Sequence, residues 1–312
     1  RCTSRCSPGC GRRSRNRIDR WDGATYRRVV VVDERPTELA VAQGGTPATP
    51  EVIVEVTPPL QTAGDEAAVR AALDRLLGLQ VALDDWYLTS MRDARRRRCA
   101  DKFKGLKPPR FPSVFEAVVN GFACQQLSLE VGLELLNRLA AIGKVHGDTS
   151  ATAGYPFPSA HDLAILRPEQ YRAIGFSRQK TLAIRELAGA VAHGHLDLER
   201  LAQEDETAAR QQLLALHGVG RWTTEYVLLR GLGRLNVFPG DDVGAQNGLA
   251  RWLGRAEAMD YQDVAKAVHR WQPYAGLVYL HLLLEGLSHA GSIPPGAIVT
   301  TAPAALSPTG AR

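Results

Sequence analysis

The sequence predicts a mostly helical α+β protein in which a small antiparallel sheet precedes a helical core. Between positions 17 and 58, turn-forming segments separate three runs of β-branched residues, at 26–32, 39–41 and 52–56. After Pro58 the apolar residues change to three- and four-residue spacing, which continues to about residue 290. A sheet of this size is too small to be stable alone.

About ten helices are expected in the second part of the chain. Clear apolar faces occur at 67–79, 83–98, 114–126, 129–142 and 178–193. Helix starts are indicated by Ser159 with Asp162 as a capping box, by Pro168 in a first turn, and by Ser177 before an alanine- and leucine-rich segment. The run Arg95–Arg98 is interpreted as the solvated end of a helix in preference to a DNA contact.

These patterns divide the chain into four segments. We expect a disordered basic tail at 1–16, a β subdomain at 17–65, a helical domain at 66–297 and a flexible tail at 298–312. The first segment is polar, arginine-rich and of low complexity, and the last is rich in Ala, Pro, Thr and Gly.

Composition excludes some classes of protein and leaves others open. The 312 residues include 38 Lys and Arg against 33 Asp and Glu, a net charge of +5 that mildly favours polyanions. Much of this excess lies in the first 17 residues, so charge alone does not establish DNA binding. The first residues lack the apolar core of a secretory signal, and no apolar run is long enough to span a bilayer. We therefore expect no membrane role.

The five cysteines indicate neither a disulfide framework nor a metal site. They are Cys2, Cys6, Cys10, Cys99 and Cys124. Their number is odd, and the three in the tail have no fourth Cys or His nearby to complete a tetrahedral site. Cytoplasmic, reduced thiols are the better interpretation.

Two glycines one residue apart lie between apolar helical patterns in segment 213–229. Gly218 and Gly220 permit a tight hairpin that directs the amides of the second helix outward, where they and the helix dipole bind an anion such as a nucleic-acid phosphate. The alternative is a tight interhelical turn with no ligand. The phosphate contacts would come from Gly218, Gly220, Arg221, Thr223 and Thr224.

Two carboxylates follow a chain break at Pro239-Gly240 and open a new helix. We assign the helix cap to Asp241 and chemistry to Asp242. The helix N-terminus favours the anionic carboxylate while burial against aromatic rings raises its pKa, and this balance suits an acid that stays charged. The alternative is that both residues only cap and solvate the helix.

Residues 213–242 closely resemble the helix-hairpin-helix and Gly/Pro-Asp signature of the HhH-GPD DNA glycosylases, specifically the 3-methyladenine DNA glycosylase II branch. Segments 103–112, 115–120, 125–128 and 174–180 also resemble this branch. The resemblance covers about residues 66–290, and the preceding strands look like the family's small N-terminal sheet. It implies a two-lobed helical core and a base-excision repair enzyme that flips alkylated purines, of the 3-methyladenine and 7-methylguanine type, out of DNA and hydrolyses the N-glycosidic bond.

The resemblance also implies the reaction type. Bifunctional relatives such as endonuclease III have a lysine nucleophile after the Gly-Arg of the hairpin, where this chain has Trp222. A monofunctional glycosylase that leaves the strand intact is therefore expected. The corresponding acid is Asp242, which would stabilise positive charge on the deoxyribose as the base departs.

The same resemblance assigns a base pocket and a wedge. Trp222 and Tyr226, four residues apart on one helical face, would line one cleft with the acid, although two core aromatics are the alternative. Leu283 stands where one relative has a further pocket tryptophan, and Ala275 where an arginine is frequent, so the base range would differ. The residue that fills the vacated stack would be Gln126, with Gln125 and Leu127 as neighbours, unless this is an ordinary capped turn.

No cofactor and no side-chain metal site are expected. The chain lacks the four-cysteine cluster that binds iron and sulfur in some relatives, and hairpin carbonyls could hold a monovalent cation. The expected partners are damaged duplex DNA and the enzymes that process abasic sites, for a monomer associated with the nucleoid. The alternatives are a glycosylase of the same fold for deaminated or oxidised bases, and a noncatalytic helix-hairpin-helix protein that binds DNA structures.

Overall fold

A computed structural model describes residues 16–45, 50–142 and 154–289. The chain divides into two compact units. Unit 1 comprises Arg1–Leu76 and Phe111–Leu232, and unit 2 comprises Leu77–Arg110 and Gly233–Arg312. The tail expected at 298–312, and all but the last residue of that expected at 1–16, lie outside the described residues. In the described part of the chain, no helix combines the length and apolar character needed to cross a bilayer.

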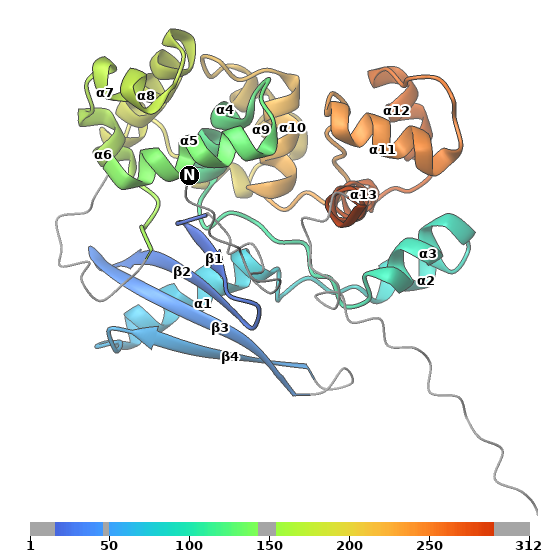
Figure 1. Ribbon diagram of the computed structural model, residues 1–312, viewed down its shortest axis with the longest axis horizontal. Coiled ribbons are helices and arrows are strands. Elements are labelled where there is room, and N and C mark those ends of the chain that lie inside the picture. The colour runs from blue at the N-terminus through green and yellow to red at the C-terminus, as the bar shows by residue number, and fades with distance from the viewer. Residues whose placement is uncertain (1–15, 46–49, 143–153, 290–312) are drawn as a thin grey trace, which may run out of the picture. The chain divides into compact units, whose positions relative to one another are not determined.

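Unit 1 begins with a four-stranded antiparallel sheet in chain order (Figure 1). Its strands are β1 (Asp19–Trp21), β2 (Thr25–Val32), β3 (Arg35–Gly45) and β4 (Pro50–Thr57). The three predicted runs are confirmed as β2, β3 and β4, whereas β1 was not predicted. Asp33 and Glu34 connect β2 to β3 with positive φ at both positions, which matches the strand twist in a two-residue hairpin.

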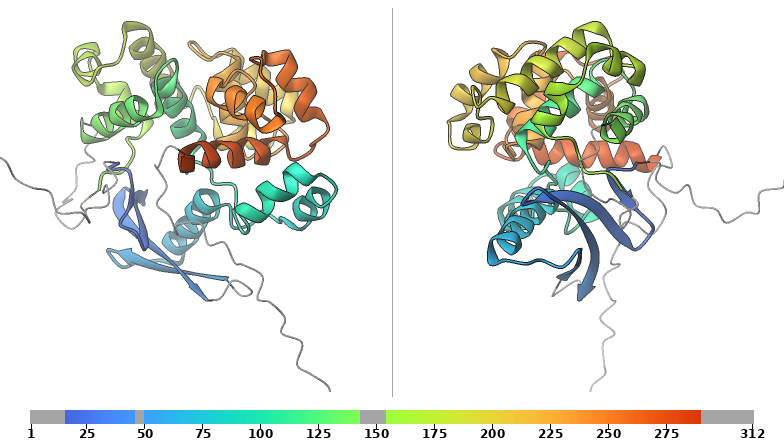
Figure 2. Two further views of the ribbon diagram at one scale, coloured as in Figure 1. Left: turned by 45° about the vertical axis from the view of Figure 1, so that its right-hand side comes forward. Right: turned by 90° about the vertical axis from the view of Figure 1, so that its left-hand side faces the viewer.

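Two kinds of contact attach the sheet to helices of the same unit, one apolar and one ionic. Helix α1 (Ala63–Leu77) lies beside the sheet (Figure 2) and buries Val69, Leu73 and Leu76. A second attachment is ionic, because Arg28 on β2 donates to both carboxylate oxygens of Glu116 in the helical part, at 2.6 and 2.7 Å.

In the helical part of unit 1, every residue of α4 (Val114–Cys124) from Val114 to Ala123 is buried. The predicted capping box at Ser159, the proline at the start of α7 and the Ser177 cap of α8 are confirmed. The elements of unit 1 that follow α4 are α5 (Leu129–Ile142), α6 (Ala160–Ile165), α7 (Pro168–Ile174), α8 (Arg178–Ala192), the 3₁₀ turn η2 (Glu199–Ala202), α9 (Glu206–Leu214) and α10 (Arg221–Arg230). Of these, α5, α8 and α10 pack against α4.

Unit 2 is helical where described, and its core contains Trp86, Trp271 and His281. His281 is buried between the rings of Trp86 and Phe103 and bonds through Nδ1 to the Leu277 carbonyl at 2.7 Å. The helices are α2 (Asp84–Ser90), α3 (Ala94–Lys102), α11 (Val243–Leu253), α12 (Tyr261–His269) and α13 (Ala275–His289).

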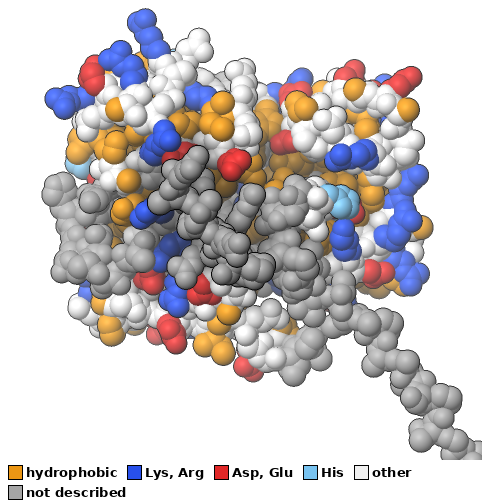
Figure 3. Space-filling view, in the orientation of Figure 1, with side chains coloured by type: hydrophobic (Ala, Val, Ile, Leu, Met, Phe, Trp, Pro, Cys, Tyr) orange, Lys and Arg blue, Asp and Glu red, His pale blue; other side chains and the backbone are white. Residues whose placement is uncertain are grey.

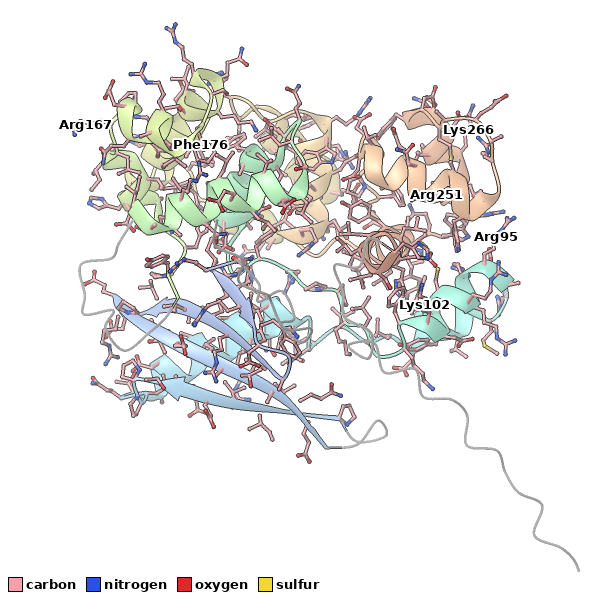
Figure 4. All side chains as sticks on the ribbon, viewed as in Figure 1. Arg95, Lys102, Arg167, Phe176, Arg251 and Lys266 are labelled. Atoms are coloured by element: carbon pink, nitrogen blue, oxygen red, sulfur yellow. The ribbon has the colours of Figure 1, made fainter. Side chains whose placement is uncertain are left out.

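The single helix predicted at 83–98 is wrong. Asp93 has extended backbone and caps a new helix by accepting from the amides of Arg95 and Arg96, so α2 and α3 are separate. The arginine run therefore opens α3 and does not end a helix. Lys and Arg side chains gather over α3 (Figure 3), with Arg95 and Lys102 at its two ends (Figure 4).

Candidate functional site

The two glycines form the predicted hairpin between α9 and α10. Gly218 has φ +80°, and a Cβ at this position would lie 2.8 Å from the Cβ of Ala183. Packing therefore requires glycine at 218. At Gly220, by contrast, φ is −99° and a Cβ would meet no atom of the described chain within 4 Å. The fold therefore does not require glycine at 220. The lack of a side chain there allows a ligand to approach the backbone closely.

Helix α10 begins after Gly220, which provides no side-chain cap. Amides of a first helical turn point beyond the end of the helix, together with the positive end of its dipole. Val219 before this turn is buried, and the Arg221 side chain is exposed. The backbone at the start of α10 thus has the geometry of an anion site.

Side-chain contacts of Thr223 and Thr224 with phosphate, which the sequence predicted, are contradicted by burial. Thr223 is 1% and Thr224 0% exposed. The Thr223 hydroxyl accepts from the Gln125 amide at 2.7 Å, and the Thr224 hydroxyl donates to the Gly220 carbonyl at 3.0 Å. Both hydroxyls bond within the protein, so only the backbone of this turn and Arg221 remain as predicted phosphate contacts.

Trp222 and Tyr226 lie on the same face of α10 and stack on one another. Their ring centroids are 5.2 Å apart with an interplanar angle of 16°. The centroids of the Tyr226 and Phe111 rings are 6.0 Å apart, and the Tyr226 hydroxyl donates to Asn120 Oδ1 at 2.8 Å. Stacked rings at this spacing leave no room for a third, so a bound base would not lie between them.

The turn from α4 to α5 separates the three predicted wedge residues. Gln125 is half-buried, and its Nε2 donates to the Gly218 carbonyl at 2.9 Å and to the Thr223 hydroxyl. Gln126 and Leu127 are exposed, and Gln126 has φ +56°. Gln125 is therefore bonded to the hairpin, while Gln126 remains the predicted wedge.

The candidate acid belongs to unit 2, and the predicted assignment of the helix cap to Asp241 is wrong. Asp242, not Asp241, is the N-cap of α11, because it has extended backbone and its side chain accepts from the Ala245 amide at 2.8 Å. The other oxygen of Asp242 accepts from the Tyr279 hydroxyl at 3.1 Å. One half-buried carboxylate thus caps the helix and is held at both oxygens.

Tyr279 was not predicted from the sequence. It lies on α13, is 3% exposed, and contacts Phe238 edge to face at 5.4 Å. Within an apolar run only its phenolic group distinguishes it, which is too weak a signal without the fold. Leu283 is one turn later on α13 and half-buried, whereas Ala275 is fully buried at the helix start.

Two expectations stay predictions. Trp222 belongs to unit 1 and Asp242 to unit 2, so their meeting in one cleft is still to be tested. The described residues contain no group of three or more His, Cys, Asp or Glu able to hold a metal, and a cation on the hairpin carbonyls is likewise untested.

Comparison with known proteins identifies the family. Residues 119–273, about half of the chain, match the family model described as "HhH-GPD superfamily base excision DNA repair protein". The chain belongs to this superfamily. The mostly helical fold with a small antiparallel sheet is confirmed by the 3-methyladenine DNA glycosylase of Archaeoglobus fulgidus, with TM-score 0.75 and 26% identity over 86% of this chain and 89% of the other.

Curated relatives match over shorter stretches. The probable bifunctional transcriptional activator/DNA repair enzyme AlkA of Mycobacterium tuberculosis is 35% identical over 61% of this chain and 37% of its own length. DNA-3-methyladenine glycosylase of Bacillus subtilis is 29% identical, over 62% of this chain and 65% of that protein. Escherichia coli DNA-3-methyladenine glycosylase 2 is 27% identical, over 57% and 60%. Less than two thirds of each of these relatives is therefore matched.

Proposed function

We propose that this superfamily member is a monofunctional DNA glycosylase that hydrolyses the N-glycosidic bond of alkylated purines, of the 3-methyladenine and 7-methylguanine type. The observation that carries the proposal is Asp242, a half-buried carboxylate fixed by two hydrogen-bond donors in a chain that has Trp222 at the place of the lysine nucleophile. The names of the relatives support alkylated purines as substrates. The product would be an abasic site in an intact strand.

Asp242 would act electrostatically. As the glycosidic bond lengthens, positive charge develops on the deoxyribose, and a fixed carboxylate stabilises that charge without reorganising. The Ala245 amide and the Tyr279 hydroxyl hold the carboxylate in one orientation. The same group can orient the water that attacks C1′.

Trp222 would bind the flipped base. An alkylated purine is electron-poor and often cationic, and such a ring stacks favourably on indole. Tyr226 supports the indole from one side, and the Tyr226 hydroxyl is fixed by Asn120. Leu283 adds neither a ring nor a polar group to its helix, so discrimination between bases would depend strongly on Trp222.

The hairpin would hold the DNA backbone at Gly220 and Arg221, independently of sequence. The partners of the protein would thus be damaged duplex DNA and, after release of the base, the enzymes that process abasic sites. We propose that it acts as a monomer in the cytoplasm, at the nucleoid.

A base-release assay tests the function. Methylated duplex DNA is incubated with the protein, and free 3-methyladenine and 7-methylguanine are quantified together with strand breaks before and after alkali. Release of both bases, with breaks only after alkali, is expected. Preferential release of uracil, hypoxanthine or 8-oxoguanine from a lesion panel would instead support the same fold with another substrate. Binding without any release would contradict the enzyme.

A matched pair of glycine variants tests the hairpin. Gly220→Ala should lower the free energy of unfolding by no more than about 1 kcal/mol, because alanine is a poorer N-cap than glycine but meets no atom here. It should weaken DNA binding, because a ligand needs the space. Gly218→Ala should lose about 2 kcal/mol or more of stability from its left-handed backbone and its contact with Ala183.

Urea unfolding and titration with undamaged duplex at several salt concentrations measure these effects. The parent affinity should fall steeply as salt rises, and less steeply in Gly220→Ala. Equal DNA affinity of Gly220→Ala and the parent protein would contradict a phosphate site at this position.

A further inference from the structure

The turn between α4 and α5, residues 125–128, is called the wedge turn below. Its second residue, Gln126, has a side chain and yet adopts φ +56°. Left-handed backbone is strained for residues with a Cβ and persists only when the surroundings enforce it. The side chain of Gln126 is exposed, so the enforcement comes from the neighbouring peptide groups.

Lys180, in the first turn of α8, holds the peptide group that precedes Gln126. Its Nζ donates to the Gln125 carbonyl at 2.8 Å and to the Ala123 carbonyl at 3.2 Å. Carbonyls at the end of a helix lack partners within the helix and favour a cation. The Gln125 carbonyl belongs to the same rigid amide plane as the nitrogen of Gln126, so Lys180 limits rotation at the entry to the strained residue.

The side chain of Gln125 connects the same peptide to the hairpin. Its Nε2 donates to the Gly218 carbonyl at 2.9 Å and to the Thr223 hydroxyl at 2.7 Å. Residue 125 is thus bonded to α8 through its backbone and to α10 through its side chain. A Cβ at Gly121, one turn earlier on α4, would lie 2.8 Å from the Thr223 methyl group, so α4 and α10 are in close contact beside this bond.

We propose that Lys180 and Gln125 are positioning residues that hold Gln126 in its left-handed conformation and fix the wedge turn to the phosphate-binding hairpin. The inference rests on the proposed function. It adds that the hydrogen bonds of Lys180 and Gln125, called the clamp below, set the distance between the phosphate bound at the hairpin and the inserted side chain. Loss of the clamp would then impair extrusion of a paired base more than binding of DNA.

The competing explanation is that Lys180 only caps α4. Removal of a cap lowers stability generally, and its effect does not depend on whether the target base is paired. Two experiments separate these explanations. Lys180→Met removes the ammonium group, whereas Lys180→Arg keeps a cation with N–H donors for both carbonyls. Arg178→Met is the matched control, because Arg178 is an exposed cation in the same helical turn.

Hydrogen exchange of the free protein tests the clamp independently of catalysis. Amides of the wedge turn should exchange roughly tenfold faster in Lys180→Met than in the parent protein. The core amides of α4 should be unchanged, and Lys180→Arg should restore the parent rate. Unchanged exchange in the wedge turn would overturn the proposal, whether or not the protein releases bases.

Base release from two substrates tests the consequence. One duplex carries the alkylated purine in a normal pair, and the other carries it opposite an abasic site, where extrusion costs less. Lys180→Met should lower the single-turnover rate roughly tenfold on the paired lesion and by no more than about twofold on the unpaired one. Gln125→Met should behave similarly, whereas Arg178→Met should show the parent ratio of the two rates.

Each outcome decides one question. If Lys180→Met loses the same fraction of its rate on both substrates, the result supports a cap and overturns the clamp. A parent-like rate of Lys180→Met on the paired lesion also overturns the clamp. If the parent protein releases no base from either substrate, the proposed function fails, and the exchange experiment alone decides the clamp.

Discussion

Substitution of Asp242 by asparagine is expected to lower the single-turnover rate of base release by about 100- to 1000-fold. The variant removes the charge and puts an NH2 group in place of the oxygen that accepts from the Tyr279 hydroxyl, whose own oxygen can accept from that group instead. Asparagine is as good an N-cap as aspartate, and its carbonyl oxygen can still accept from the Ala245 amide, which lies 2.8 Å from the carboxylate in the parent protein. The rate loss should therefore occur without a comparable loss of stability.

Asp241→Asn is the matched control, because it makes the same change of charge one residue earlier in the chain. Since Asp242 and not Asp241 caps α11, the control should release bases within about twofold of the parent rate. Thermal unfolding of both variants shows whether the helix is intact. The assignment is refuted if Asp242→Asn excises at the parent rate, or if Asp241→Asn loses as much activity.

Where local chemistry decides a structure, it could be predicted from the sequence. The capping box at Ser159 and the hairpin at Gly218 depend on a few neighbouring residues, and both are observed. The β-branched runs likewise predicted three of the four strands. The short β1 carries too little pattern to be recognised, and its residues join the sheet by pairing with β2.

The failures concern choices that only tertiary structure makes. Either of two adjacent aspartates can cap a helix, and the backbone conformation at residue 242 decides which one does. The burial of Thr223 and Thr224 follows from the packing of α10 against α4, which residue spacing does not reveal. Tyr279 lies 37 residues from its partner Asp242, so no local motif connects them.

The second large effect is expected in the folding of unit 1. Arg28 and Glu116 are 2% and 6% exposed in their side chains, and together they join β2 to α4. Burial raises the pKa of Glu116 above its usual value, and the Arg28 guanidinium opposes this rise. Arg28→Met leaves the carboxyl group buried without its cation, which should lower the free energy of unfolding by about 3–5 kcal/mol.

The cost should depend on pH. Without Arg28, the pKa of Glu116 is expected to rise further, because burial still disfavours the charged carboxylate and the guanidinium no longer opposes this rise. The folded state then binds a proton more tightly than the unfolded chain. A carboxyl group whose folded pKa is raised stabilises the protein below the unfolded pKa and loses that contribution as pH rises. The variant should therefore differ least from the parent protein in acid and most near neutral pH, as urea unfolding at several pH values will measure.

Two controls distinguish the ion pair from general disruption of the sheet. Arg27→Met changes the neighbouring residue on β2, whose ion pairs with Asp22 and Glu38 are partly exposed at 3.8 and 3.5 Å, and should cost no more than about 1 kcal/mol. The double variant Arg28→Met with Glu116→Leu replaces the pair by apolar groups and should recover most of the lost stability. Arg28 also donates through Nη1 to Asp19 Oδ1 at 2.6 Å. If the double variant is as unstable as Arg28→Met, the loss comes from packing or from this second bond, and the buried carboxylate is not its cause.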